Sequence, residues 1–196
     1  MIITMQQLKE KYKEYSDIKG KVSREIKNGT LIPIVKGIYE TDKNTSGYKL
    51  SQFIYGPSYL SFDYVLYING VIPEAIYKTY TCATFNKKKI KKYQNNFGMY
   101  IYRDVPKEVY SYGINIVNDG KYCYHIATVE KALCDKIYTM SPVRSLKDLK
   151  QMLFEDLRID EEKFKEMNKE EILSIALKYH SNNLNMLAKF IEKGNG

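Results

Sequence analysis

The feature that most constrains the fold of this chain is a change of pattern at Thr128. Before it lie four segments of strand composition, rich in Tyr, Thr, Ile and Val, at 77–84, 97–103, 111–117 and 121–126. From Thr128 onward, apolar residues recur at helical spacing, and the segments open on the caps Thr128, Ser145 and Asn168. Strands gathered in one part of the chain and helices in another predict an α+β protein with a small, mainly antiparallel sheet.

The beginning of the chain has a different outline. A capping box of the form Thr-x-x-Gln starts at Thr4, and a second helix carries an apolar stripe of Ile18, Val22 and Ile26. Asn-Gly at 28–29 ends that helix, and LIPIVKGIYET then forms a tight hairpin. Helix, turn, basic helix and hairpin in this order predict a winged helix-turn-helix. We place this domain at 1–44 and a larger α+β domain at 45–196.

The basic residues of the N-terminal unit indicate a partner. A winged helix inserts its second helix into the major groove and sets its hairpin beside the phosphates. The candidate DNA-binding residues are the polar positions off the apolar stripe and one position in the hairpin: Lys19, Lys21, Ser23, Arg24, Lys27 and Lys36. The alternative is a small helical cap on a larger domain, whose Lys and Arg side chains are only solvated.

Positive charge is concentrated in the first two-thirds of the chain. Residues 1–44 carry nine Lys/Arg against six Asp/Glu, residues 45–125 ten against five, and residues 126–196 twelve against twelve, which together give the net charge of +8. This distribution favours a polyanionic partner at that end.

One run within it holds five lysines in six residues, Lys87, Lys88, Lys89, Lys91 and Lys92. It is either an additional nucleic-acid or antitoxin surface or a solvated loop that keeps a sheet edge from aggregating.

Motifs for catalysis or metal binding are missing from the sequence. It has no GxSxG, no Gly-rich phosphate loop and no HExxH, and Cys123-x-His125 lacks a second pair of ligands. We therefore expect no catalytic residues, no metal and no cofactor. The competing hypothesis is a metal-dependent nuclease or nucleotide-modifying enzyme that uses Glu74, Glu130 and Asp135.

The location of the protein is predicted from three further observations. No apolar run approaches the ~18–20 residues that span a bilayer, and the first residues do not form a signal peptide. The cysteines, Cys82, Cys123 and Cys134, have no paired spacing, which is typical of reduced thiols. We expect a cytoplasmic protein without a membrane partner.

The segment GPSYLSFDYVLYINGVIPE resembles the approach to an active site, but helix termini account for its polar residues. Ser61 is expected to cap a helix that Gly70 ends, with Asp63 in its first turn, where the helix dipole favours a carboxylate.

Four motifs, taken in order, resemble a known family. They are Gly37-x-Tyr39 at the end of the hairpin, Ser-Tyr-Leu-Ser at 58–61, Gly-Val-Ile-Pro-Glu at 70–74 and IATVEKALCD at 126–135. Together they resemble the AbiEi family, the antitoxins and transcriptional regulators of AbiE type IV toxin–antitoxin systems. Asn69 stands where the family often has His, which argues against an obligatory base at that position.

The resemblance implies a bifunctional protein that takes part in phage defence by abortive infection. Its winged helix would bind an inverted repeat in the promoter of its own operon and repress it. The C-terminal domain would oppose a nucleotidyltransferase-like toxin without forming a stable complex with it. A weaker alternative is direct sequestration of the toxin. The oligomeric state stays open.

Overall fold

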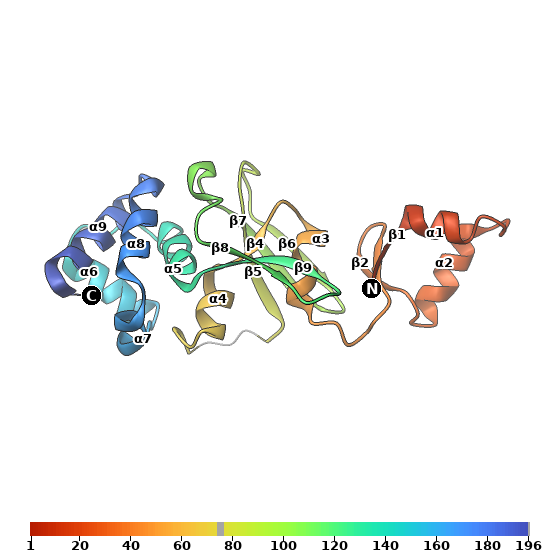
Figure 1. Ribbon diagram of the computed structural model, residues 1–196, viewed down its shortest axis with the longest axis horizontal. Helices are drawn as coiled ribbons and strands as arrows, with labels where there is room; N and C mark the ends of the chain where they lie inside the picture. Colours follow the sequence, from red (N-terminus) through yellow and green to blue (C-terminus); the bar gives the residue numbers. More distant parts are fainter. Residues whose placement is uncertain (74–76, 196) are drawn as a thin grey trace.

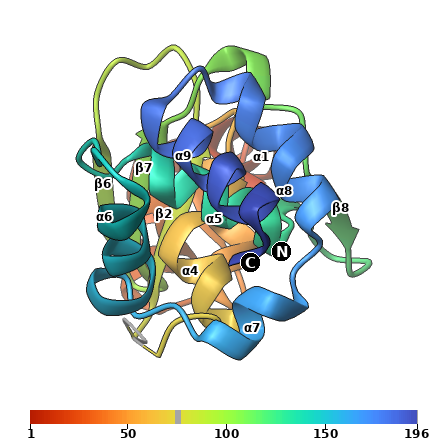
Figure 2. The ribbon, with the colours of Figure 1, turned by 90° about the vertical axis from the view of Figure 1, so that its left-hand side faces the viewer.

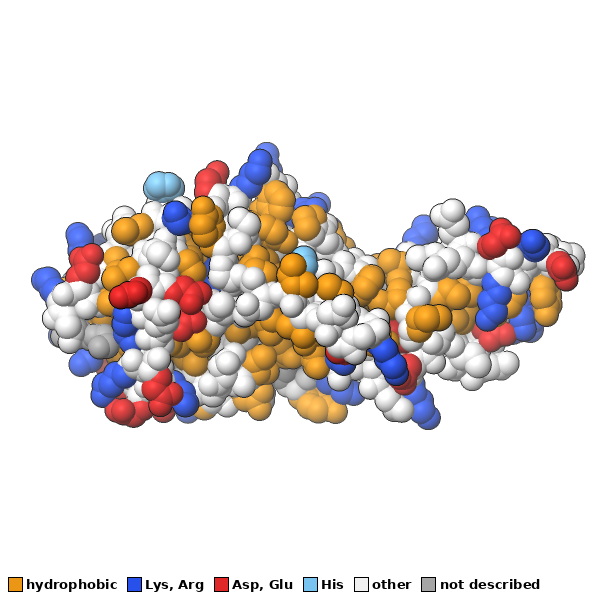
Figure 3. Space-filling model, viewed as in Figure 1, with side chains coloured by type: hydrophobic (Ala, Val, Ile, Leu, Met, Phe, Trp, Pro, Cys, Tyr) orange, Lys and Arg blue, Asp and Glu red, His pale blue; other side chains and the backbone are white. Residues whose placement is uncertain are grey.

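The computed structural model describes residues 1–73 and 77–195 of the chain. Its outline is elongated, with the N-terminal unit at one end, a sheet in the middle and a group of helices at the other end (Figure 1). The molecule narrows to a waist between the N-terminal unit and the rest (Figure 3). The separation of sheet and C-terminal helices confirms the α+β class. Glu74, one of the proposed catalytic carboxylates, lies outside the described residues.

The N-terminal unit has two helices and a three-stranded antiparallel sheet of order β1-β3-β2. Its elements are β1 (Ile2–Thr4), α1 (Met5–Lys11), α2 (Ile18–Lys27), β2 (Ile32–Val35) and β3 (Ile38–Glu40). The capping box is confirmed, since Thr4 Oγ1 accepts from the Gln7 amide at 3.3 Å and the Gln7 side chain accepts from the Thr4 amide at 2.8 Å. Strand β1 was not predicted.

The central sheet has six strands in the order β6-β7-β5-β4-β9-β8. They are β4 (Tyr59–Leu60), β5 (Thr79–Thr84), β6 (Lys91–Asn95), β7 (Gly98–Asp104), β8 (Ile114–Asn118) and β9 (Cys123–Ala127). The pairs β5–β7 and β4–β9 are parallel and the other three are antiparallel. Antiparallel pairs are therefore in the majority, as predicted, but the sheet is mixed, and its two parallel pairs were not expected. Parallel strands are joined by crossover connections between segments that are distant in the sequence. The residue pattern within a strand therefore does not indicate that it pairs in parallel.

Helices of the C-terminal part collect around α5 (Figure 2). Seven of its ten residues are buried, because it lies between the sheet and the helices α4, α8 and α9. The helices are η1 (Gly47–Leu50), α3 (Ser51–Ile54), α4 (Phe62–Ile68), η2 (Lys107–Val109), α5 (Val129–Tyr138), α6 (Leu146–Gln151), the π-helical η3 (Met152–Asp156), α7 (Glu161–Glu166), α8 (Lys169–Ala176), η4 (Leu177–Tyr179), α9 (Asn182–Phe190) and the π-helical η5 (Ile191–Asn195). Within the described ranges, none has the length and apolar character needed to cross a bilayer.

A buried carboxylate joins the N-terminal unit to the sheet. Glu40, at the end of β3, is fully buried and accepts hydrogen bonds from the amino group of Met1, the amides of Thr41 and Asp42, and the hydroxyl of Tyr122 at 2.9 Å. Burial opposes ionisation of Glu40, but these donors outweigh it and lower its pKa. Thr45 also reaches the Tyr122 hydroxyl, at 3.0 Å. The predicted domain boundary between residues 44 and 45 is thus anchored to the β8–β9 hairpin.

The lowered pKa of Glu40 predicts a stability that depends on pH. The folded state favours the ionised carboxylate, so its contribution is complete above the ordinary pKa of 4.5 and disappears as the pH falls through the lower pKa of the folded state. Near neutral pH, Tyr122→Phe should lower the free energy of unfolding by about 1.5–3 kcal/mol. Below the folded-state pKa the penalty should shrink. Urea unfolding at both pH values tests this, with Tyr112→Phe, an exposed tyrosine, as control. Equal penalties at both pH values would contradict the assignment.

Candidate nucleic-acid interface

The exposed face of α2 carries cations without an acidic side chain among them. The carboxylate of Asp17 accepts from the Gly20 amide at 2.8 Å and starts the helix. A side chain at Gly20 would collide with that carboxylate, because an added Cβ would lie 1.9 Å from it. The opposite face packs into a small core, which consists of Leu8, Tyr12, Val22, Leu31 and Tyr39 with Ile3, Met5, Ile18 and Ile26 at its margin.

Four of the six predicted DNA-binding residues share this exposed face. Lys19, Ser23, Arg24 and Lys27 are all exposed, and at 100° per residue they fall on one side of the helix. Three positive charges therefore lie together on the solvent side of a helix whose other side is held against α1 and the hairpin.

Lys21 is placed differently from these four. Its Nζ lies 2.7 Å from Glu25 Oε1 and 5.5 Å from the ring centres of Tyr12 and Tyr15. The hydrogen bond to Glu25 raises the pKa of Lys21, and the hydrogen bonds from Lys21 and Thr30 lower the pKa of Glu25. Lys21 thus braces α2 against the end of α1, and its charge is already paired.

The hairpin between β2 and β3 presents Lys36 to solvent. The residue after it, Gly37, has φ +81°, a left-handed conformation that glycine adopts without strain. The Gly37 carbonyl accepts from the Met5 amide at 2.8 Å, which ties the turn to the start of α1. Lys36 therefore lies on a turn that is fixed relative to the start of α1.

The lysine run is divided between a turn and a strand. Asp104 accepts the amides of Lys87 at 2.6 Å and Lys88 at 2.7 Å, so the first part is held by its backbone. Lys87 Nζ reaches the carbonyl of Gly56 at 3.2 Å. One of the two interpretations of the run was a solvated loop, yet Lys91 and Lys92 begin β6 at the edge of the sheet. Lysine has low strand propensity, so pairing with β7 decides this strand.

Two of the proposed catalytic carboxylates have structural partners. Asp135 is fully buried in α5, where its Oδ2 accepts from Tyr59 at 3.0 Å and from Ser61 at 2.6 Å. Its Oδ1 accepts from Tyr179 and lies 3.1 Å from the buried Nζ of Lys131. Burial, followed by the charge of Asp135, raises the pKa of Tyr59 and Tyr179, so both hydroxyls stay protonated. We call these five residues the Asp135 cluster.

The Asp135 cluster corrects the expectation for Ser61. Ser61 occupies the N-cap position of α4, but its side chain makes no capping hydrogen bond and binds Asp135 instead. Asp63 lies in the first turn of α4, as expected, and also pairs with Lys136 at 2.6 Å. The spacing of Lys131 and Asp135, one helical turn apart, was a signal that could have indicated the pair. The hydroxyl groups that bind Asp135 come from distant parts of the sequence, and no local pattern indicated that they would meet it.

Glu130 and Asp135 do not share a cavity. Glu130 lines a cavity of about 260 Å³ with Lys163 and Glu166, and it accepts the Asn168 amide at 2.9 Å. Asp135 lies in the interior and lines neither this cavity nor the pocket around Met152 that is described below. Across residues 1–73 and 77–195, no group of three His, Cys, Asp or Glu side chains is arranged to hold a metal ion.

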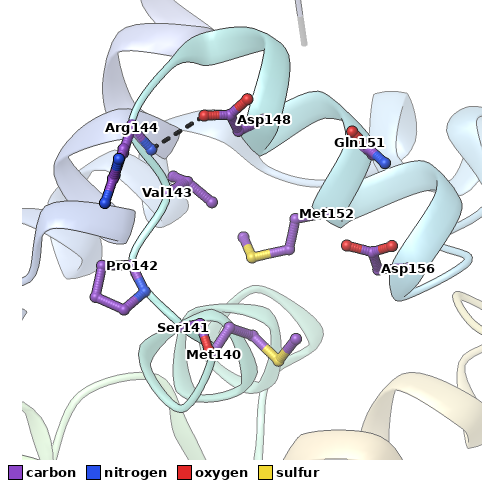
Figure 4. A pocket seen from close by; sticks show the side chains of 9 residues that line it. All are labelled: Met140, Ser141, Pro142, Val143, Arg144, Asp148, Gln151, Met152 and Asp156. Atoms are coloured by element: carbon purple, nitrogen blue, oxygen red, sulfur yellow. Dashed lines mark hydrogen bonds between the residues drawn. The ribbon is translucent and has the colours of Figure 1, made fainter.

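A separate pocket of about 470 Å³ lies among the C-terminal helices (Figure 4). Met140, Val143 and Met152 form its apolar part, with Asp148 and Asp156 at its margin. The carboxylate of Asp148 accepts the Arg144 amide at 3.3 Å. None of the predicted site residues lines this pocket.

No family model matches this chain, and no curated protein is detectably similar.

Proposed function

We propose that this protein is a DNA-binding transcriptional regulator whose N-terminal unit acts as a winged helix-turn-helix. The observation that supports this most directly is the exposed face of α2, where Lys19, Arg24 and Lys27 lie together beside Ser23. Helix α2 would enter the major groove, and Lys36 on the hairpin would contact the adjacent phosphates.

The charge pattern of α2 suits a duplex. Each lysine or arginine that neutralises a phosphate releases condensed counterions, so affinity from such contacts falls as salt rises. Ser23, between the cations, can donate to or accept from a phosphate or a base edge. Lys21 contacts Glu25 and the ring of Tyr12 and so helps to fix the orientation of α2, which suits a helix that contacts DNA.

Binding to the DNA upstream of the gene for this chain tests the proposal. Fluorescence anisotropy with labelled duplexes tiled across that region should find one duplex that binds more tightly than the others. The logarithm of its binding constant should fall linearly with the logarithm of salt concentration. Equal, weak binding to every tile, or none at all, would overturn the proposal.

We further propose that residues 45–196 act as an antitoxin of a type IV system in phage defence, opposing a nucleotidyltransferase-like toxin without a stable complex. The support is the resemblance to the AbiEi family, together with the position of its motifs. Tyr59 and Ser61 come from one motif, Lys131 and Asp135 from another, and they meet in the Asp135 cluster. Two of the four motifs thus contribute residues to the same buried cluster of this chain.

Co-expression with the product of the adjacent gene tests the antitoxin role. If that product is a nucleotidyltransferase-like toxin, this chain should restore growth, and affinity purification should not recover the toxin with it. Growth rescue with stable co-purification would favour direct sequestration. Absence of rescue at equal expression would overturn the role. The contacts of Glu130 and Asp135 give the nuclease alternative no support.

A further inference from the structure

Strand β6 lies directly beside the hairpin that carries Lys36. The Asn95 side chain at the end of β6 donates to the carbonyl of Ile34 in β2 at 2.9 Å, and its oxygen accepts the Phe97 amide at 2.8 Å. Ile34 itself is buried in the main core with residues of the sheet. The edge of the large sheet and the hairpin are therefore held together by a hydrogen bond from a side chain to a backbone carbonyl and by packing in the core.

A groove of about 560 Å³ runs between these two elements. Ile26 of α2 and the β2–β3 hairpin line one side, and Gln94, Asn95 and Asn96 line the other. Its lining includes Lys36 and contains no acidic side chain. Most of the lining side chains are apolar, but the groove also presents the ammonium of Lys36 on one side and the amides of Gln94, Asn95 and Asn96 on the other, and these polar groups suit a polyanion.

The exposed side chains of β6 continue this surface away from the groove. Lys92 and Gln94 are exposed, whereas Tyr93 between them is partly buried and packs against Tyr55 and Tyr102, with ring centres 5.8 and 5.9 Å apart. At about 3.3 Å per residue, Lys92 lies roughly 10 Å along the strand from Asn95. That length corresponds to about three base pairs of a duplex, at 3.4 Å per phosphate on each strand.

We propose that Lys92 and Gln94 on β6, together with Lys36 across the groove, bind the phosphate backbone of DNA that flanks the sequence contacted by α2. This inference rests on the proposed DNA-binding function and extends its contact surface to the second part of the molecule. Lys87 is excluded from this contact surface, because its side chain donates to the carbonyl of Gly56 and its amide donates to Asp104. The competing explanation is that lysines on an edge strand only prevent strands of other molecules from pairing.

Lys92→Ala in the full chain tests the inference on two duplexes. One carries the bound site with its natural flanks, and the other is trimmed on the hairpin side by one helical turn, about 10 base pairs. On the long duplex the variant should bind about fivefold more weakly near 0.15 M salt, with a salt slope smaller by about one. On the trimmed duplex it should bind like the wild-type protein. Lys147→Ala, an exposed lysine of α6 with the same loss of charge, is the matched control.

The outcomes separate this inference from the proposed function. If the wild-type protein binds no duplex, the function itself fails. If the wild-type protein binds and Lys92→Ala behaves like Lys147→Ala, the β6 contact is overturned and the edge-protection explanation stands. Equal loss on both duplexes would overturn the flanking position. Lys92→Gln, which keeps most of the side chain, should reproduce Lys92→Ala if charge is the cause.

Discussion

Replacement of Asp135 by asparagine should lower the free energy of unfolding by about 3–5 kcal/mol, a large part of the 5–15 kcal/mol typical of a domain. The shape of the side chain is kept, but the fully buried ammonium of Lys131 loses the only charge opposite it within hydrogen-bonding distance among the described residues. Urea unfolding followed by circular dichroism, with unchanged slope, measures the loss.

Two further variants identify the cause of this loss. Asp63→Asn removes a carboxylate from a partly exposed ion pair with Lys136 and should cost no more than about 1 kcal/mol. The double variant Lys131→Met, Asp135→Asn should recover part of the stability, because no uncompensated charge stays buried. Full recovery is not expected, since Tyr59, Ser61 and Tyr179 then face a weaker acceptor. An Asp135→Asn penalty as small as that of Asp63→Asn would contradict a stabilising role for the cluster.

The triple variant Lys19→Ala, Arg24→Ala, Lys27→Ala should weaken binding to the operator about a hundredfold near 0.15 M salt. Each lost phosphate contact reduces the salt slope by about 0.9, so the slope should fall by about 2.7 if all three residues contact phosphates. All three side chains are exposed, so the stability of the fold should change by no more than about 0.5 kcal/mol per site. Anisotropy titrations over a range of salt concentrations give both quantities.

Lys21→Ala is the internal control for this experiment. It removes a positive charge from the same helix, but one that already pairs with Glu25. Its salt slope should therefore stay close to that of the wild-type protein. Its affinity for DNA should change only because α2 loses the contacts of Lys21 with Glu25, Tyr12 and Tyr15. A triple variant that retains the wild-type slope would remove α2 from the binding surface and leave the helical-cap interpretation.

The polar residues of the N-terminal unit show which contacts can be predicted from neighbouring residues in the sequence and which cannot. Thr4 and the hairpin around Gly37 were predicted correctly, because their hydrogen bonds join residues only a few positions apart. Lys21 was grouped with the exposed cations because its ring partners depend on how α2 packs against α1. The same limit applies to β6, whose strand conformation depends on pairing with β7.

The α+β class, the helix caps at Thr128, Ser145 and Asn168, and the basic face of α2 could be predicted from the residues alone, because they depend on spacing and on contacts within one helical turn. The hydrogen bond from Ser61 to Asp135, 74 residues away, and the hydrogen bond from Tyr179 to the other oxygen of the same carboxylate could not be predicted, because long-range packing creates them. Burial removes water from these groups, so each must find a partner inside the protein, wherever the fold brings one.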